Sequence, residues 1–130
     1  MEGCIMNDCP SNIILINGPT GSGKSLYIRQ LGATPANTLN SEQLVDEILE
    51  MCHNKTSLAD LVVKLHYVRF FENMESLRGK EETQKLAAQL VLRLSSQHRI
   101  VITGIDFKGR LPFFLDSLKS YQFMQLPKRC

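Results

Sequence analysis

The strongest constraint on the fold of this chain is a glycine-rich stretch near its N-terminus. The stretch reads Gly18, Pro19, Thr20, Gly21, Ser22, Gly23, Lys24, Ser25. It matches the phosphate-binding pattern G-x-x-x-x-G-K-[ST] at every position. Glycines let successive backbone N–H groups turn toward an anion. Lys24 would then contact the β- and γ-phosphates, and the Ser25 hydroxyl would ligate Mg²⁺. The pattern predicts that residues 18–25, with Leu26 beside them, bind ATP or ADP.

The residues around this loop have the patterns of a strand and a helix. Ile13–Asn17 is a short apolar run rich in β-branched residues, typical of a strand buried on both faces. After the loop, Leu26, Ile28 and Leu31 can line one side of a helix, and Gly32 suits its C-terminal end. A phosphate-binding loop requires this order of strand, loop and helix. The alternative is a glycine-rich turn that binds no ligand.

The rest of the chain alternates strand and helix patterns. We expect further strands at residues 38–39, 67–71, 100–103 and 123–126. We expect helices that begin at Asn40 with a capping box to Gln43, at Ser57, near residue 80, and at Pro112. This alternation predicts a three-layer α/β P-loop NTPase fold with a mainly parallel sheet and right-handed crossovers. We expect residues 1–12 to form a flexible arm and residues 13–130 to form a single domain.

Composition narrows the class of protein further. The chain is 43% hydrophobic and 22% charged, as in ordinary globular proteins, and its net charge of +2 is too small to indicate nucleic-acid binding. The four cysteines (Cys4, Cys9, Cys52 and Cys130) have neither zinc-site spacing nor a disulfide pattern. Reduced thiols, the lack of a signal peptide pattern and the lack of a membrane-spanning stretch predict a cytoplasmic protein without a membrane partner.

Ligands of parallel sheets bind at the carboxyl ends of the strands. Glu72 follows the strand expected at 67–71 and is the candidate acid for the Mg²⁺ shell, although an ordinary exposed glutamate is the alternative. Asn73 can orient water but cannot accept its proton, so hydrolysis should be slow. Glu75 could replace it only if the strand ended later. Thr103 could bond the γ-phosphate or the water, or be structural. The predicted catalytic residues are Lys24, Glu72, Asn73 and Thr103. The predicted metal ligands are Ser25 and Glu72.

Four stretches of the sequence resemble one known family. They are residues 18–25; 41–45, Ser-Glu-Gln-Leu-Val; 77–84, Leu-Arg-Gly-Lys-Glu-Glu-Thr-Gln; and 100–104, Ile-Val-Ile-Thr-Gly, with Leu118-Lys119-Ser120 downstream. Between about residues 13 and 127 the chain resembles the bacterial replication initiator DnaA and its shorter AAA+ relatives of the Hda type. The resemblance implies an AAA+ base subdomain with a five-stranded sheet in the order 5-1-4-3-2.

The chain departs from the pattern of this family at functional positions. Where the family has paired Walker B aspartates, this chain has Glu72 and Asn73. The sensor aspartate of the family falls at Ile105, next to Asp106, and its arginine finger falls at Tyr121. The helical lid would begin after residue 127, and the DNA-binding domain has no counterpart. These departures imply a base subdomain with weak or absent hydrolysis, and sequence-specific DNA binding is not expected.

Three functions therefore compete. The leading one is a DnaA-like AAA+ protein that binds ATP or ADP with Mg²⁺ and acts in bacterial DNA replication, or regulates it, through a replication-protein partner. Residues 1–12 lack the Gln-Leu type of motif with which Hda-type proteins reach the sliding clamp. The second is a small P-loop phosphotransferase, which would need an acceptor site and an arginine-bearing lid. The third is an interaction module that does not hydrolyse nucleotide. The oligomeric state is left open.

Overall fold

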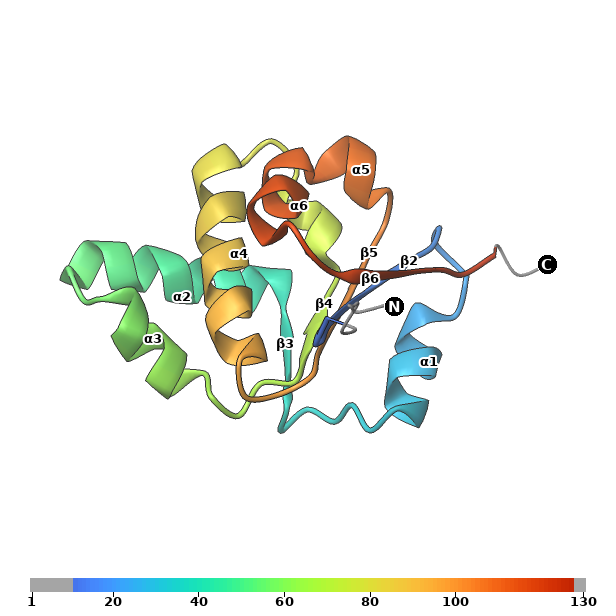
Figure 1. Ribbon diagram of the computed structural model, residues 1–130, viewed down its shortest axis with the longest axis horizontal. Helices are drawn as coiled ribbons and strands as arrows, with labels where there is room; N and C mark the ends of the chain where they lie inside the picture. The colour runs from blue at the N-terminus through green and yellow to red at the C-terminus, as the bar shows by residue number, and fades with distance from the viewer. Residues whose placement is uncertain (1–10, 128–130) are drawn as a thin grey trace.

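A computed structural model describes residues 11–127, which form an α/β fold built on a parallel sheet (Figure 1). The strands are β2 (Ile13–Asn17), β3 (Thr38–Asn40), β4 (Phe70–Glu72), β5 (Ile100–Gly104) and β6 (Gln122–Gln125). Within residues 11–127 the sheet has five strands in the order β3-β4-β5-β2-β6, and every pairing is parallel. In chain order this is 2-3-4-1-5, the expected order 5-1-4-3-2 seen from the other edge. The predicted sheet is confirmed.

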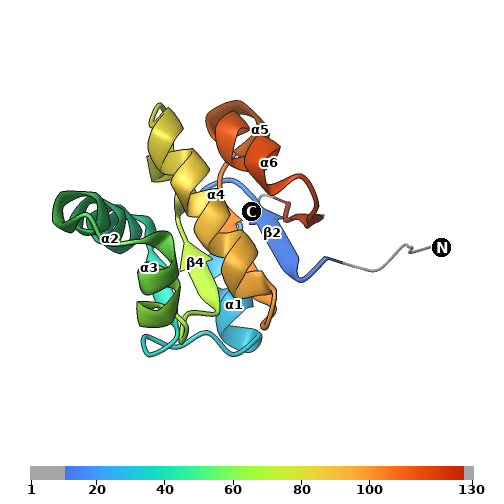
Figure 2. The ribbon, with the colours of Figure 1, turned by 60° about the vertical axis from the view of Figure 1, so that its left-hand side comes forward.

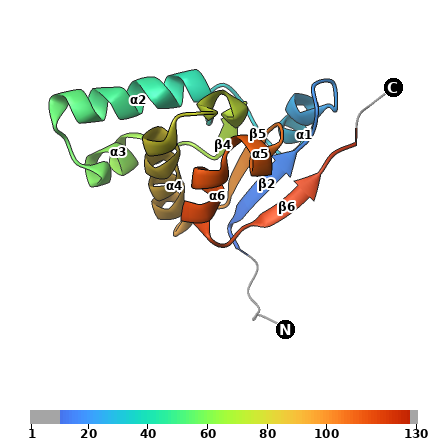
Figure 3. The same ribbon diagram turned by 90° about the horizontal axis from the view of Figure 1, so that it is seen from above.

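Helices cover both faces of this sheet. They are α1 (Lys24–Gln30), α2 (Ser41–Asn54), α3 (Leu58–Lys64), the 3₁₀ helix η1 (Met74–Leu77), α4 (Glu81–Ser95), α5 (Phe107–Arg110) and α6 (Pro112–Leu118). Helix α1 lies on one face, and α2, α3, α4 and α6 lie on the other (Figures 1 and 2). The arrangement is the three-layer fold that the alternating pattern predicts. Figure 3 shows β6 beside β2 at one edge of the sheet.

Neighbouring residues of each strand point to opposite faces, because side chains alternate along a strand. In β4, Phe71 is fully buried in the large core under α2, α4 and α6, whereas Phe70 belongs to a small core under α1. In β2, Leu15 and Ile16 divide in the same way. The sheet therefore supports two cores of different size.

Capping boxes begin α2 and α3. The Asn40 side chain accepts a hydrogen bond from the Gln43 N–H at 2.9 Å, and the Gln43 side chain accepts one from the Asn40 N–H at 2.9 Å. Ser57 and Asp60 make the same reciprocal pair at the start of α3. Each box satisfies two backbone N–H groups that the helix itself leaves free. The capping predicted from Asn40 and Gln43 is confirmed.

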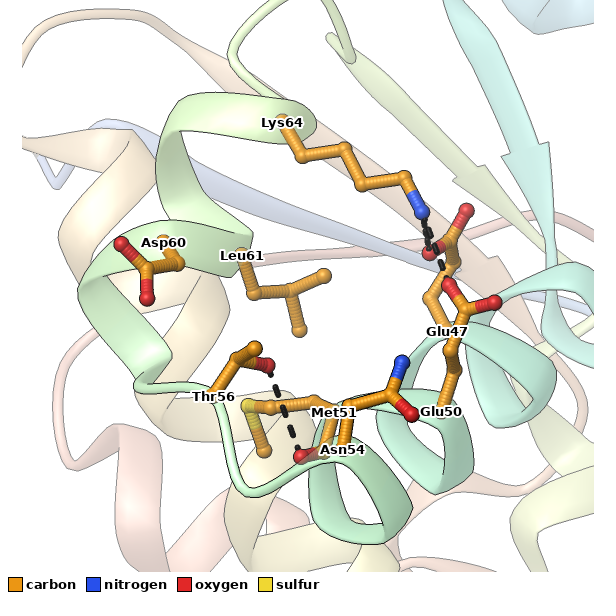
Figure 4. Close-up of a pocket in the computed structure, with 8 residues that line it drawn as sticks. All are labelled: Glu47, Glu50, Met51, Asn54, Thr56, Asp60, Leu61 and Lys64. Atoms are coloured by element: carbon orange, nitrogen blue, oxygen red, sulfur yellow. Dashed lines mark hydrogen bonds and ion pairs between the residues drawn. The ribbon is translucent and has the colours of Figure 1, made fainter.

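Helices α2 and α3 are joined across their exposed sides by one lysine. Lys64 Nζ lies 2.7 Å from a carboxylate oxygen of Glu47 and 3.0 Å from one of Glu50, as Figure 4 shows. The side chains of Lys64 and Glu50 are more than half exposed. Ion pairs this exposed contribute little to stability in salt-containing water. The α2–α3 pair is held mainly by its buried apolar residues.

The fourth expected helix contains a polar residue that the apolar pattern did not reveal. Leu86 of this helix is only partly buried, whereas the polar Gln84 is fully buried. The Gln84 side-chain amide donates to the Leu77 carbonyl at 2.9 Å and the Arg110 carbonyl at 3.4 Å. Its carbonyl oxygen accepts from two N–H groups, those of Phe113 and Phe114, both at 3.2 Å. One side chain thus connects η1, α5 and α6 to α4.

Two sequence predictions are wrong: the start of one strand and the apolar face of the first helix. The strand expected at 67–71 is β4, which begins three residues later, because the N–H groups of Arg69 and Phe70 both donate to the Asn37 carbonyl in a loop. Leu26, Ile28 and Leu31 were expected to line one side of a helix, but Leu31 follows the end of α1, and Leu26 and Leu31 are 48% and 51% exposed. Only Ile28 of that helix is buried, because α1 rests on the sheet along a narrow strip.

The start of the described chain is tied to the ends of later elements. The Ser11 hydroxyl donates to the Ser120 carbonyl at 3.2 Å, and the Asn12 side-chain amide donates to the Ser95 carbonyl at 3.0 Å. Residues 1–10 of the expected arm, with Cys4 and Cys9, and residues 128–130, with Cys130, lie outside the described residues. Among the described helices none is long and apolar enough to cross a membrane.

Candidate functional site

The glycine-rich loop continues from β2 at the carboxyl edge of the sheet. The Gly18 N–H donates to the Gly104 carbonyl at 3.2 Å, and the Ser22 N–H donates to the Pro19 carbonyl at 3.1 Å. A Cβ on Gly18 would lie 2.5 Å from Ser22 Oγ, so a larger residue there would have to displace the Ser22 side chain. Gly23 has a φ of 87°, in the left-handed region that favours glycine. These contacts hold the loop in one compact turn.

Several backbone amides of this turn are free. The N–H groups of Thr20, Gly21 and Gly23 have no hydrogen-bond partner among residues 11–127. The residue before α1 is Gly23, which has no side chain to cap the first turn of the helix. Successive unpaired N–H groups in such a turn form an anion-binding concavity. The loop residues expected to bind nucleotide therefore offer the donors that a phosphate requires.

Lys24 lies across the loop. Its Nζ donates to the Gly18 carbonyl at 2.6 Å and to the Pro19 carbonyl at 3.0 Å, and it lies 3.5 Å from Ser22 Oγ. Partial burial lowers the pKa of the Lys24 ammonium, and the negative charge of Glu75 opposes this shift. The ammonium thus donates hydrogen bonds to carbonyl groups of the loop. It can exchange these acceptors for phosphate oxygens, which are stronger acceptors.

Two cavities meet at Ser25. One, of about 530 Å³, is lined by Ser25, Glu72, Asn40 and Arg29 among others. The other, of about 330 Å³, is lined by Ser25, Lys24 and the turn after β4. Ser25 and Glu72, the expected metal ligands, therefore line a common cavity. No group of three or more His, Cys, Asp or Glu side chains within residues 11–127 could hold a metal without help. This donor set fits Mg²⁺, which is usually held by one or two carboxylates together with substrate phosphates.

The other residues expected at the strand ends have different environments. Asn73 has a left-handed φ of 58° and lines the smaller cavity with Lys24. Its N–H donates to the Thr103 hydroxyl at 3.2 Å, and Thr103 is buried. In this structure Thr103 supports the turn that carries Asn73 and does not line the cavity with Lys24. The expected contact of Thr103 with phosphate or water stays a prediction.

The positions that the resemblance associates with sensor and finger residues also have defined surroundings. Ile105 lines the cavity that contains Lys24. Asp106 does not line this cavity. Its carboxylate accepts a hydrogen bond from the Gly109 N–H at 3.2 Å and caps α5. Tyr121 packs against the large core. None of these three side chains provides a second cation near Lys24.

Sequence reasoning gave too small a role to one residue near the loop, Glu75, and assigned no role to another, Asn17. Glu75, set aside because the strand seemed to end too early, lines the cavity beside Lys24. Asn17 joins three segments: its side-chain oxygen accepts from the Phe107 N–H at 3.0 Å, and its amide donates to Gln125 at 2.6 Å. A polar residue at the end of a buried strand was the available signal for Asn17.

The fold and the position of the loop define a class: a P-loop α/β domain with a central 5-1-4-3-2 sheet. Solved structures with this fold include domain III of the replication initiation protein DnaA of Thermotoga maritima, with a TM-score of 0.63, 17% identity and 89% of this chain covered. Others are a DnaA bound to AMPPCP and single-stranded DNA (TM-score 0.62, 14% identity, 88% covered) and an AMPPCP-bound DnaA from Aquifex aeolicus (TM-score 0.58, 13% identity, 93% covered).

Similarity at this level of sequence identity establishes a shared fold. No model of a known protein family matches the chain. The chain spans 55% of the Thermotoga maritima structure, and 40% and 41% of the other two. The comparisons thus confirm the architecture that the resemblance implied.

Proposed function

We propose that this chain is a nucleotide-binding protein that holds ATP or ADP in the loop of residues 18–25. The observation that carries the proposal is the set of unpaired loop N–H groups beside the Lys24 ammonium. An array of amides with one cation is what a nucleotide polyphosphate requires. The AMPPCP-bound DnaA structures with the same fold support this choice of ligand.

The cavity that Ser25 shares with Glu72 would hold Mg²⁺ bound together with the nucleotide. The Ser25 hydroxyl and the Glu72 carboxylate supply oxygen ligands, which Mg²⁺ prefers. The residue after Glu72 is an amide, Asn73, which cannot take a proton from water, so hydrolysis that depended on this residue alone would be slow. Leu26, half exposed beside the loop, borders the nucleotide.

Calorimetric titration of Mg²⁺-ATP into the protein tests this proposal. We expect saturable binding by the wild type and a loss of at least about tenfold in affinity for Lys24→Ala, because a charge-assisted hydrogen bond to phosphate is removed. Lys85→Ala is the matched control: this lysine lies on α4 and pairs with Glu81 and Glu82. Its affinity for ATP should equal that of the wild type. If the wild type neither releases heat nor gains thermal stability with ATP, nucleotide binding is refuted.

We further propose that the nucleotide-bound chain acts through protein contacts in or around the initiation of DNA replication. The support is the fold shared with DnaA structures. Mixing the chain with purified DnaA and following the elution volume with ATP, with ADP and without nucleotide tests the idea. A complex that depends on nucleotide supports it. Free migration of both proteins under all three conditions argues against DnaA as the partner.

A further inference from the structure

Glu75 is held at the edge of the sheet by a rigid turn. Asn73, in the left-handed conformation, reverses the chain after β4, and η1 follows immediately. Met74 and Leu77, on either side of Glu75 in this short helix, are both fully buried in the large core. The Arg78 N–H donates to the Glu75 carbonyl at 3.1 Å and closes the turn. The position of Glu75 is therefore defined by packing on both sides.

The Glu75 side chain is placed against the loop, and one of its carboxylate oxygens has no hydrogen-bond partner within residues 11–127. It lines the cavity of about 330 Å³ together with Lys24, Ser25 and Gly21. Its oxygen Oε1 has no accessible surface and accepts no hydrogen bond within the described residues. A buried, unpaired carboxylate oxygen costs free energy, since it has lost its water without gaining a donor. Because Oε1 is closed to solvent, a donor bound in the cavity would remove this cost only after a rotation of the Glu75 side chain.

The other acids near the loop do not line the cavity that contains Lys24. Glu72 lines the neighbouring cavity with Ser25, and Asp106 caps α5. Glu75 is the one carboxylate among residues 11–127 that lines the cavity containing Lys24. Asn73, which lines the same cavity, carries no basic group.

We propose that the Glu75 carboxylate is the general base for hydrolysis of ATP bound at the loop. This inference rests on the proposed nucleotide binding. The water oxygen forms a bond to the γ-phosphorus while the bond from that phosphorus to the bridging oxygen breaks. The bridging electron pair leaves with ADP, and the proton of the water passes to a Glu75 oxygen. Glu75 thus performs the step that the Asn73 amide cannot.

Two kinds of measurement on Glu75→Gln test the proposal. The rate of ATP hydrolysis at saturating ATP should fall at least about 100-fold, as when a general base is removed. Independently of activity, calorimetry should show ATP binding about fivefold more tightly than to the wild type, with ADP binding unchanged. The reason is that a negative charge facing the γ-phosphate is removed, and only ATP carries that group.

Two further variants separate the role of the base from that of the fold. Glu75→Asp keeps the charge and should keep the wild-type ratio of ATP to ADP affinity, while its hydrolysis rate falls. Glu82→Gln, at an exposed position on α4, should match the wild type in both measurements. The melting temperature of each variant without nucleotide checks that it is folded.

The outcomes are distinguishable. If the wild type binds ATP and Glu75→Gln hydrolyses it at the wild-type rate, Glu75 is not the base. Binding of ATP by the wild type with no hydrolysis at all also overturns the inference, and it leaves the proposed nucleotide binding standing. If the wild type binds no ATP, the calorimetric titration refutes the proposed function itself, and the inference with it.

Discussion

The two faces of the sheet differ in how much they bury. One face lies under α2, α4 and α6 and contains most of the buried apolar side chains among residues 11–127. The other face lies under α1, and its described buried core consists of Ile16, Ile28, Ala33, Phe70 and Val101. Beside this small core a cavity of about 700 Å³ opens along the sheet, with Ile14, Tyr27 and Met124 in its walls.

This difference separates the folding stability of the domain from the proposed nucleotide binding. Buried apolar area is the main source of folding free energy, so the face under α2, α4 and α6 contributes most of it. The loop of residues 18–25 and α1 lie at the edge of the small core. Substitutions in the loop can therefore change ligand binding without unfolding the domain, and stability variants can be chosen far from the loop.

The largest expected effect compares two adjacent phenylalanines of β4. Phe71→Ala should destabilise the protein by about 4 kcal/mol, because it leaves a cavity in the large, closed core. Phe70→Ala should cost about 2 kcal/mol, since its side chain borders the cavity open to water and mainly transfer free energy is lost. Urea unfolding of both variants measures the two losses. Equal losses would show that the two faces contribute alike.

The next effect concerns the polar connection inside the large core. Gln84→Leu should destabilise the protein by about 3 kcal/mol, because two N–H groups and the Arg110 carbonyl lose their side-chain partner. The Leu77 carbonyl keeps the N–H of Lys80 as a donor. The control is Gln89→Ala on the exposed side of α4, which should change the unfolding free energy by less than about 0.5 kcal/mol. A Gln84→Leu variant as stable as the control would mean that these backbone groups find other partners.

A smaller effect is expected at the helix caps. Asn40→Ala should destabilise the protein by about 1 kcal/mol through loss of the capping box of α2. Ser57→Ala removes the equivalent box of α3 and should cost a similar amount. Asn40 lines the cavity with Glu72 and Ser25, whereas Ser57 does not. If the proposed Mg²⁺ site is correct, calorimetry should show weaker Mg²⁺-ATP binding only for Asn40→Ala.

The smallest effect is expected at the exposed lysine between α2 and α3. Lys64→Ala removes two ion pairs, but the side chains of Lys64 and Glu50 are more than half exposed to water, which screens the attraction. At physiological salt we expect the urea midpoint to stay within experimental error of the wild type. A midpoint shift as large as that of Asn40→Ala would show that Lys64 holds α3 in place.

Elements with strong local patterns could be predicted from the sequence. The apolar run Ile13–Asn17 forms β2, and the capping pattern at Asn40 begins α2 as expected. The order of the sheet followed from the resemblance and is confirmed. For the strand and the helix cap the signal lies within a few neighbouring residues, whereas the sheet order came from a resemblance that covers most of the chain.

Elements that depend on distant partners could not be predicted. The start of β4 was misplaced because the Asn37 carbonyl accepts from the N–H groups of Arg69 and Phe70, so that the strand begins only at Phe70. Gln84 reads as a polar surface residue until α5 and α6 are placed around it. Leu26 and Leu31 fit a buried helical stripe, yet the narrow contact of α1 with the sheet leaves both exposed.

By itself the sequence determined the chemistry of the loop: glycines, Lys24 and Ser25 at fixed spacing next to a strand. Only the tertiary structure decided which acids lie near that loop. Glu72, Asn73 and Glu75 are close together along the chain, and a left-handed turn at Asn73 places Glu72 with Ser25 and Glu75 with Lys24. The reason is that the conformation of this turn depends on the buried side chains of η1 and on the Thr103 hydroxyl, which are contacts between separate strands and helices.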